Sequence, residues 1–581
     1  MIHSSVQFWV TVFLNHRNLI MIKNIARILI SSYILLCTIP AKAAVAPVAP
    51  DSGQTMRELE KKRELSIPKA TIPLKHSTEP EPKAEGVIGD IRMLVNSIRV
   101  TGNTVISSVE LEGLLADLVG GEHSLAELND AAARITAYYH EQGYIVSRAY
   151  IPPQEIKDGV VMISVQEGRI GKLHVDNQSR LSDEVAGKYF SVIRSGDVLQ
   201  AGYVERAILL LNETPGVGVA SAILRPGTSI GSADVVVELP PSVLYSANIQ
   251  VDNYGNYFTG ENRLGAELAI NSPLMLGDML TLRALGTDKN LTYGYLAYQV
   301  PVGGSGLRIG ATNSGTSYSL DNEFVSLKIK GKATIGSIFA LYPFIRTLKN
   351  NLAGTLTLED KQFKDDFVPA SVTTEKQVRM ATIGLTFNHL DNFIGGGATT
   401  LNISLAKGNL SLDDASLSID KGSANTNGPF SRFNYTLNRL QRLSDRVSLW
   451  FSLSGQNANK NLNSSEQFSL GGAYGVRAYP QGEAIGDDGR LATLEIRANF
   501  TQTLQSKLFY DAGSVNFNHD PYLSDKNTRF ISGGGVGVNA KVFGVDINAI
   551  LALRGSGGQP SSEPLTTDRK SRWWLQVGKN F

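Results

Sequence analysis

Apolar and polar residues alternate along the second part of the chain, from about Leu244 to the C-terminus. A period of two predicts strands with one apolar and one polar face. The alternating runs last roughly nine or more residues, the length of a transmembrane strand, whereas strands of globular proteins average about five or six. A secreted β-sandwich would also alternate, but the strand length favours a membrane barrel. Leu401 to Leu405, Val447 to Ser454 and Val545 to Arg554 are parts of the chain in which the alternation is plain.

The length of this region sets the expected number of strands. At roughly 21 residues per strand and connection, residues 245–581 accommodate about 16 antiparallel strands, although about 14 or 18 would also fit. A barrel of this size encloses water, so its inward faces can carry charges that lipid would reject. The predicted fold is therefore mainly β, with a transmembrane antiparallel β-barrel as its largest part.

Two shorter units of similar pattern precede the barrel, at residues 90–168 and 169–241. Each shows strand, helix, helix, strand and strand in that order, so the pattern indicates a tandem repeat. The expected strands of the first unit are 93–100, 144–151 and 160–166, around helices at 107–119 and 125–142. In the second unit we expect strands at 171–176, 217–224 and 233–239 and helices at 183–190 and 201–211.

A short, highly charged helix is predicted at residues 51–66, within a region that we bound at 44–66. Met56, Leu59 and Leu65 are its apolar residues, which give too narrow a stripe to bury in a core. Such a helix either stands in solvent or lies in a polar cavity. Residues 67–89 carry four prolines among charged and hydroxyl residues, so they are predicted to form an extended linker.

Residues 1–43 resemble a secretory signal peptide in composition. Basic residues precede an apolar run from Ile28 to Ile39, and Ala41-Lys42-Ala43 forms a small-x-small cleavage site. The apolar run is short for an uncleaved membrane anchor. Met21 stands directly before the basic residues and is the expected start of translation. Cleavage near Ala43 would remove Cys37, the one cysteine of the chain.

Composition excludes several classes of function. The 581 residues contain 55 Lys and Arg against 54 Asp and Glu, which argues against nucleic-acid binding. One cysteine and eight scattered histidines argue against a metal site, and we expect no cofactor. The sequence has no phosphate-binding Gly-x-x-x-x-Gly-Lys-Ser/Thr motif and no hydrolase motif. We therefore expect that the protein is not an enzyme.

Two features suggest that the barrel lumen is occupied. A long Gly-rich connection, residues 471–489, carries Arg477 among small and aromatic residues. On a later strand, the parity that places Leu508 and Tyr510 toward lipid places Asp511 inward. Arg477 could pair bidentately with that carboxylate, although separate solvated charges are the simpler interpretation of two residues 34 positions apart in the sequence.

These residues resemble motifs of the TpsB family, the outer-membrane transporters of two-partner secretion, which share a superfamily with BamA. Val476-Arg477-Ala478-Tyr479 is similar to the Val-Arg-Gly-Tyr motif of the sixth extracellular loop. The resemblance implies that this loop folds into the lumen and that Arg477 pairs with Asp511 as a lock between loop and barrel. Val476, Tyr479, Phe509 and Gly513 are the expected supporting residues.

The sequence departs from the family pattern at two positions. Ala478 replaces the motif glycine, so the loop tip is expected to lose backbone freedom. Lys579 stands third from the C-terminus, where barrels of this kind usually carry an apolar or aromatic residue. That substitution puts the efficiency of barrel assembly in question.

The resemblance also assigns the regions before the barrel. The units at 90–168 and 169–241 resemble two periplasmic POTRA domains, with Ile98 to Asn103 and Leu210 to Val217 matching family segments. The charged helix resembles the plug helix that the family threads through the barrel.

The resemblance implies a bacterial outer-membrane translocase that secretes an unfolded partner exoprotein, such as a haemolysin, adhesin or contact-dependent toxin, without ATP. The alternative is a BamA-type or TamA-type insertase that assembles outer-membrane proteins. A passive porin would need no POTRA domains. Expected partners are a TpsA-type client, outer-membrane lipid and lipopolysaccharide, and the barrel-assembly machinery during biogenesis. We expect a monomer in the outer membrane of a Gram-negative cell, with the POTRA domains in the periplasm.

Overall fold

The computed structural model describes residues 50–60, 74–76, 92–564 and 569–581. The predicted signal peptide, with Met21 and Cys37, lies outside the described residues. So do most of the predicted linker and the end of the predicted charged helix. In the part of the chain that the structure describes, no helix is long and apolar enough to cross a membrane.

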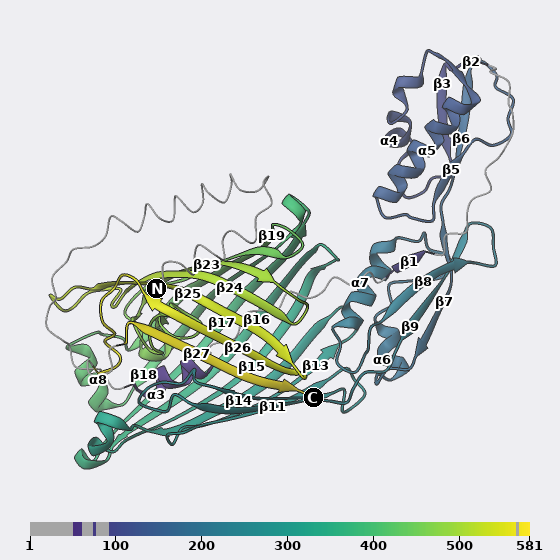
Figure 1. Cartoon of the computed structure of the whole chain (residues 1–581). Helices are drawn as coiled ribbons and strands as arrows, with labels where there is room; N and C mark the ends of the chain where they lie inside the picture. The colour runs from purple at the N-terminus through teal and green to yellow at the C-terminus, as the bar shows by residue number, and fades with distance from the viewer. Residues whose placement is uncertain (1–49, 61–73, 77–91, 565–568) are drawn as a thin grey trace. The chain divides into compact units, whose positions relative to one another are not determined.

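Sixteen antiparallel strands form a closed barrel in which every strand pairs with its neighbours along the chain (Figure 1), as predicted. The final strand closes the barrel by pairing with the first, in the register Asn248↔Asn580 to Asp252↔Gln576. The strands are β10 (Tyr245–Asp252), β11 (Arg263–Asn271), β12 (Met279–Thr287), β13 (Thr292–Val302), β14 (Leu307–Ser319), β15 (Ile329–Arg346), β16 (Asn350–Phe367), β17 (Val372–Asp391), β18 (Gly397–Leu412), β19 (Gly428–Arg442), β20 (Val447–Ala458), β23 (Asp488–Asn499), β24 (Leu504–Asn516), β25 (Thr528–Val542), β26 (Val545–Arg554) and β27 (Ser571–Asn580).

The alternation along β24 has the predicted sense. Leu508 and Tyr510 are 57% and 47% exposed on the outer surface, whereas Phe509 and Asp511 are buried. The polar–apolar alternation therefore arises because one face of each strand meets lipid and the other meets the lumen. Lys579 is accommodated in β27, opposite Ile249 of β10, with its ammonium 5.1 Å from the ring centroid of Phe581.

The first unit before the barrel contains the predicted elements in order, but the strand expected at 93–100 is divided into two, at 92–94 and 97–101, and a further short strand at 122–124 precedes the second helix. Its sheet has the order β3-β6-β5 and packs on the longer helix, which begins at a capping box between Ser124 and Glu127. Leu128, Ile135 and Tyr139 of that helix are fully buried. The elements are β2 (Arg92–Leu94), β3 (Ser97–Thr101), α4 (Ser108–Gly113), η1 (Ala116–Leu118), β4 (Glu122–Ser124), α5 (Leu125–Glu141), β5 (Arg148–Tyr150) and β6 (Val160–Gln166).

The second unit repeats the strand, helix, helix, strand, strand order. Its sheet has the order β1-β8-β9-β7, where β1 (Leu74–His76) comes from within the predicted linker and pairs parallel to β8. That strand was not predicted, because three residues among prolines carry no readable period. The other elements are β7 (Arg169–Asn177), α6 (Asp183–Lys188), α7 (Ala201–Asn212), β8 (Ser221–Pro226) and β9 (Ser232–Leu239).

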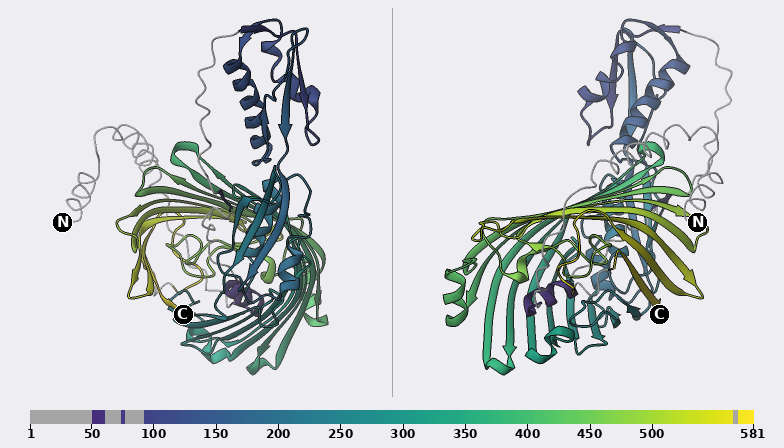
Figure 2. Two further views of the ribbon diagram at one scale, coloured as in Figure 1. Left: turned by 90° about the vertical axis from the view of Figure 1, so that its right-hand side faces the viewer. Right: turned by 60° about the vertical axis from the view of Figure 1, so that its left-hand side comes forward.

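A few short elements complete the described chain. Helix α3 (Ser52–Glu60) lies inside the barrel, against β15, β16 and η5 (Figure 2). The chain between β20 and β23 contains η5 (Ser464–Glu466), β21 (Phe468–Ser469) and β22 (Ile485–Gly486), and its tip is also buried in the lumen. Helix α8 (Asp414–Lys421), η2 (Asn322–Leu327), η3 (Val368–Ala370) and η4 (Phe393–Gly395) lie in other connections.

Candidate functional site

Arg477 and Asp511 meet inside the barrel. The Arg477 Nε donates to Asp511 Oδ2 at 2.9 Å, and its Nη2 donates to Oδ1 at 2.8 Å. The backbone N–H of Arg477 also donates to Oδ2, at 3.1 Å. Asp511 is fully buried, so the two-point contact replaces the water that each charge has lost.

Glu495 on β23 is a second carboxylate partner that the sequence did not reveal. Arg477 Nη1 donates to its Oε1 at 2.6 Å, and Arg497 also pairs with it. The Arg477 guanidinium carbon lies 3.5 Å from the ring centroid of Phe509, which covers one face of the cation. The only signal in the sequence is parity: Glu495, like Thr493, falls on the inward face of β23.

Two aromatic residues fasten the loop tip to the last strands of the barrel. The Trp574 indole N–H on β27 donates to the carbonyl oxygen of Arg477 at 2.8 Å. The Tyr479 hydroxyl lies 3.0 Å from the carbonyl oxygens of both Ser556 and Gly558. Val476 and Tyr479 are completely buried. The loop tip therefore contacts the strand that closes the barrel, and Trp574 is a second residue that sequence reasoning missed.

Small residues provide the space that the loop needs. A Cβ on Gly513 would lie 2.5 Å from a methyl carbon of Leu470, so the glycine admits an apolar side chain of the loop. Ala478 replaces the motif glycine, and the loss of backbone freedom at the loop tip stays a prediction. Ala478 does not have a positive φ, so its backbone conformation suits alanine as well as glycine. Its methyl group instead occupies space left by Gly533 on β25, where an added Cβ would lie only 2.3 Å from it.

Helix α3 is anchored to the wall at its N-terminus. Asp51 accepts a hydrogen bond from the Gln54 N–H at 2.9 Å, which caps the helix, and pairs with Lys376 on β17 at 2.6 Å. Ser52 donates its N–H and its hydroxyl to Asp365 on β16, at 3.0 and 2.8 Å. The start of α3 is thereby tied to two adjacent strands.

The middle of α3 inserts one apolar side chain into the wall. Met56 is 1% exposed and packs in a cluster with inward-facing residues of the barrel. Farther along, Glu60 accepts a hydrogen bond from the Ser314 hydroxyl at 2.8 Å. The helix has only a narrow apolar stripe, and a small apolar cluster inside the barrel is enough to bury it. The cluster contains Tyr293, Ala333, Ile335, Phe363, Val378, Met380, Ala406, Leu410, Phe430 and Leu462.

The helix and the loop also touch each other, so that they occupy the lumen together. The Ser464 hydroxyl donates to Asp51 at 2.6 Å, and a Cβ on Gly53 would lie 3.0 Å from Ser465. A cavity of about 380 Å³ remains between α3, the loop and the wall. Burial raises the pKa of the Asp51 carboxyl. The positive charge of Lys376 and the hydrogen bonds that the Asp51 carboxylate accepts outweigh burial, and they hold that pKa below its ordinary value.

Among the described residues, no group of three or more His, Cys, Asp and Glu side chains could hold a metal ion. What the lumen contains is a helix and a loop held by buried ion pairs, hydrogen bonds and one apolar contact. Such an arrangement can close a channel and can reopen if those contacts are exchanged for others.

The fold defines a class: an outer-membrane β-barrel preceded by a periplasmic β-α-α-β-β domain, with a helix and a loop inside the barrel. Residues 231–540, more than half of the chain, match the family model of haemolysin secretion/activation proteins of the ShlB/FhaC/HecB type. Residues 93–168 match the ShlB-type POTRA domain. The chain belongs to this family of two-partner secretion transporters, and the expected membership is confirmed.

Individual relatives agree with the family assignment. The chain is 27% identical over 564 residues to the heme/hemopexin transporter protein HuxB of Haemophilus influenzae, covering 95% of this chain and 98% of that one. It is 24% identical to the outer membrane transporter CdiB of Dickeya dadantii, over 78% of this chain and 82% of that one. The solved structure of CdiB from Escherichia coli has a TM-score of 0.68 at 20% identity, over 91% of this chain and 96% of that one. The relatives are named as transporters, which agrees with a protein that is not an enzyme.

Proposed function

We propose that this protein carries an unfolded partner exoprotein from the periplasm through its barrel to the cell surface, without ATP. The observation that carries the proposal is the family match together with a 16-stranded barrel whose lumen holds a helix and a loop. An assembly insertase shares the barrel fold, but the relatives that span most of this chain are named as transporters.

The relatives suggest classes of exoprotein. These relatives are named for heme and hemopexin transport and for haemolysin transport. We propose that the client is a large secreted exoprotein of this general kind, which leaves the cell unfolded and folds outside. Folding on the far side of the membrane would make its passage irreversible.

We propose that Arg477 and Asp511 lock the loop between β20 and β23 inside the barrel, with Val476, Tyr479, Phe509 and Gly513 in support. The contacts that support this role are the two-point ion pair and the phenyl ring over the guanidinium. Breaking one partner of a buried pair leaves the other charge uncompensated, so the lock favours one position of the loop.

The region before the barrel is proposed to comprise the plug helix region at 44–66, a linker at 67–89 and POTRA domains at 90–168 and 169–241. Supporting observations are the buried position of α3 and the repeated order of elements in the two units. The second unit contacts the periplasmic end of the barrel through Glu213, which pairs with Arg346 at 2.6 Å. Client recognition would use the strand edges of these units, because β-augmentation reads backbone more than side chains.

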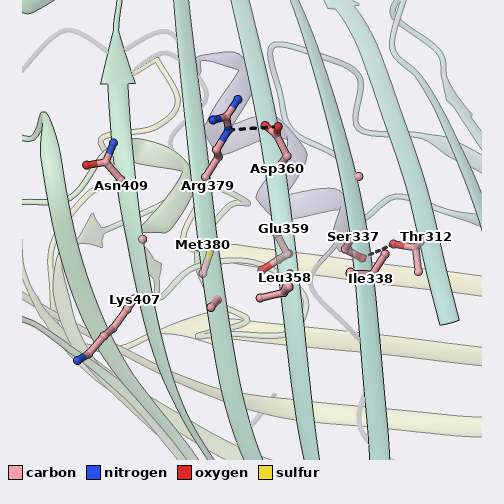
Figure 3. Close-up of a pocket in the computed structure, with 13 residues that line it drawn as sticks. Thr312, Ser337, Ile338, Leu358, Glu359, Asp360, Arg379, Met380, Lys407 and Asn409 are labelled. Carbon is pink, nitrogen blue, oxygen red and sulfur yellow. Dashed lines mark hydrogen bonds and ion pairs between the residues drawn. The ribbon is translucent and has the colours of Figure 1, made fainter. Parts of the chain in front are cut away.

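Outer-membrane lipid and lipopolysaccharide are proposed to contact the outer wall of β15 to β18. Figure 3 shows Arg379 beside Asp360, at 3.5 Å between Nε and Oδ2, with Ile338 and Leu358 nearby. Ile338 and Leu358 are 57% and 45% exposed, as expected of lipid-facing residues. Arg379 and Lys407 fall on the same outward face, where cations could meet lipid phosphates.

We also propose that the chain acts as a monomer and is inserted by the barrel-assembly machinery.

Co-expression tests this function. The chain and a large candidate exoprotein chosen from the neighbouring genes are expressed together in a Gram-negative host that lacks both, and the exoprotein is measured in the medium and at the cell surface. Secretion that depends on the chain supports the proposal. If the exoprotein stays in the periplasm while deletion of the chain in its own host depletes many outer-membrane proteins, the insertase alternative is correct.

A further inference from the structure

Strands β15 to β18 are the four longest strands of the barrel. They have 18, 18, 20 and 16 residues, whereas the two strands that close the barrel, β10 and β27, have 8 and 10. The chain enters the barrel at Tyr245 from the periplasmic side, and successive strands run in opposite directions. The Ile329 end of β15 and the Phe367 end of β16 therefore face the cell surface. Because a strand needs only about 9–11 residues to cross the hydrocarbon layer, part of each long strand lies outside it.

The outward side chains of these strands show where the hydrocarbon layer ends. In the row nearest the periplasm of those compared, Ile383 and Leu405 are apolar and exposed, as lipid-facing residues are. From the periplasmic side toward the cell surface, the aligned outward residues of β16, β17 and β18 are Leu356, Ile383 and Leu405; Leu358, Ala381 and Lys407; Asp360, Arg379 and Asn409; and Gln362, Gln377 and Ser411. The wall therefore changes from apolar to polar at the rows of Lys407 and Arg379.

Arg379 and Lys407 lie at this boundary with little to neutralise them. Lys407 is exposed and forms no ion pair with any residue that the structure describes. Arg379 pairs with Asp360, but both side chains are exposed to water, so the pair is weak. A hollow of about 800 Å³ in the wall is lined by both cations and by Leu358 (Figure 3). An outward cation is costly at the membrane centre and tolerated beside phosphates, so the two cations mark the level of the lipid phosphates.

A second pair of cations lies farther toward the cell surface. Lys332 on β15 is directly opposite Lys364 on β16, and both side chains are exposed. Like charges in this position repel each other and destabilise a sheet, and an anion between the two ammonium groups would relieve that repulsion. Lys364 is four residues beyond Asp360. That spacing is about 13 Å along the strand, which puts the lysine pair outside the hydrocarbon layer.

The carboxylates on the same face leave a positive charge at each of the two levels. Asp360 balances Arg379 but leaves Lys407 without an anion. Glu375 lies 2.9 Å from Lys364, whereas Lys332 forms no ion pair within the described part of the chain. Both pairs are exposed, so a carboxylate can be exchanged for a phosphate at little cost.

We propose that this face of β15 to β18 binds lipopolysaccharide through phosphate groups at two levels. Arg379 and Lys407 hold a phosphate of the lipid anchor, and Lys332 and Lys364 hold a phosphate on the sugars that stand above the membrane. Charge complementarity selects this occupant, because a phospholipid carries its phosphate at one level only. The inference rests on the proposed lipid contact of β15 to β18 and deepens it, since it names the lipid and the side chains that hold it.

Binding measurements with the full chain in detergent test the proposal. The probes are lipopolysaccharide trimmed to its lipid anchor and phosphorylated inner sugars, and the same material after enzymatic removal of its phosphates. The unaltered chain should bind the phosphorylated form with a Kd about tenfold lower, since each cation near a phosphate adds affinity. This comparison needs no variant, so it does not depend on how a variant folds. Equal affinity for the two forms would overturn the proposal and leave only a general lipid contact.

Paired substitutions assign the two levels. Arg379→Gln with Lys407→Gln, and separately Lys332→Gln with Lys364→Gln, should each raise the Kd for the phosphorylated form about tenfold. Lys421→Gln is the matched control, because this exposed lysine lies on α8, in a connection at the same end of the barrel, and it should leave the Kd unchanged. If the variant at Lys332 and Lys364 binds like the unaltered chain, the upper contact does not exist and the proposal fails.

Two further measurements separate this inference from its alternatives. Phosphatidylglycerol, with one phosphate level, should bind about tenfold more weakly than lipopolysaccharide does, and equally tight binding would overturn the proposal. Secretion of the co-expressed exoprotein is recorded in parallel. Secretion by the unaltered chain without any preference for phosphorylated lipopolysaccharide removes this inference and leaves the transport function. A preference without any secretion supports the lipopolysaccharide site and removes only the proposed transport.

Discussion

The methyl group of Ala478 fills the space that Gly533 leaves open. A Cβ on Gly533 would lie 2.3 Å from the Cβ of Ala478 and 2.9 Å from the carbonyl oxygen of Leu553. Ala478 is 2% exposed, so the contact belongs to the buried interface between the loop and β25. The residue that departs from the family motif is thus matched by a glycine on the facing wall.

Gly533→Ala is expected to displace the loop tip at a cost of about 1–3 kcal/mol, because the added methyl group overpacks this interface. Hydrogen exchange of residues 470–482 in the purified barrel measures the effect, and exchange should become faster. Ala478→Gly alone should leave exchange nearly unchanged. The double variant should recover much of the protection, and an unrelieved Gly533→Ala defect would show that the clash with Leu553 dominates instead.

The ion pair of Arg477 provides a second prediction. Asp511→Asn should destabilise the loop by roughly 3–5 kcal/mol, since it leaves a buried guanidinium without its main partner. Arg477→Lys keeps the charge but loses the two-point geometry, so its effect should be intermediate. Single-channel conductance in planar bilayers reports the position of the loop, and both variants should fluctuate between more open levels than the parent.

Glu495, the second carboxylate partner of Arg477, is expected to contribute less to holding the loop than Asp511 does. Because it receives hydrogen bonds from both Arg477 and Arg497, Glu495→Gln should weaken the loop less than Asp511→Asn does. The same conductance recordings rank the variants. A Glu495→Gln variant as open as Asp511→Asn would mean that the two carboxylates act as one unit.

The sequence carried enough information to predict the barrel and the pair Arg477 and Asp511, but not the surroundings of that pair. Alternation gives the strands, because lipid and lumen impose opposite demands on neighbouring residues. Parity also points Asp511 inward, and the family resemblance names its partner. Glu495 and Trp574 were missed because which inward residues meet a folded loop depends on the register of strands far apart in the sequence.

The position of the charged helix shows the same limit from another side. Its apolar stripe is too narrow for a core, which leaves solvent as the default interpretation and a polar lumen as the alternative that the family resemblance favours. Met56 decides between them in the structure, because it enters an apolar niche composed of residues from many strands. No local sequence pattern predicts that niche, and none predicts the three-residue strand β1.

Met56 is therefore expected to hold the plug. Met56→Ala should weaken the seating of α3 by about 2–5 kcal/mol, through the lost contacts and the cavity that remains. Met56→Leu preserves most of the volume and serves as the control. Mean conductance in planar bilayers should rise for Met56→Ala and stay near the parent value for Met56→Leu. Deletion of residues 51–66 gives the largest increase in conductance that loss of the helix can produce. If conductance does not rise on deletion, the helix is not a plug.

Glu167 in the first POTRA domain gives a prediction about pH. Its carboxylate accepts hydrogen bonds from the backbone N–H of Val105 at 2.9 Å and the Tyr139 hydroxyl at 3.1 Å, and from both the N–H and the hydroxyl of Thr104. Burial raises the pKa of Glu167, but these hydrogen bonds outweigh it and hold the pKa below the ordinary 4.5. The group therefore binds fewer protons in the folded domain than in the unfolded one.

The sign of the effect follows from that difference. The stabilisation is fully present above pH 4.5 and is lost as the pH falls through the lower pKa of the folded state. Hydrogen exchange of residues 93–168 in the full chain should therefore show falling protection below that pH, after correction for intrinsic exchange rates. Glu167→Gln should lower protection by about 1–3 kcal/mol at neutral pH and should flatten the acid dependence, because the amide cannot titrate. An equally steep acid dependence in the Gln variant would place the responsible carboxylate elsewhere in the domain.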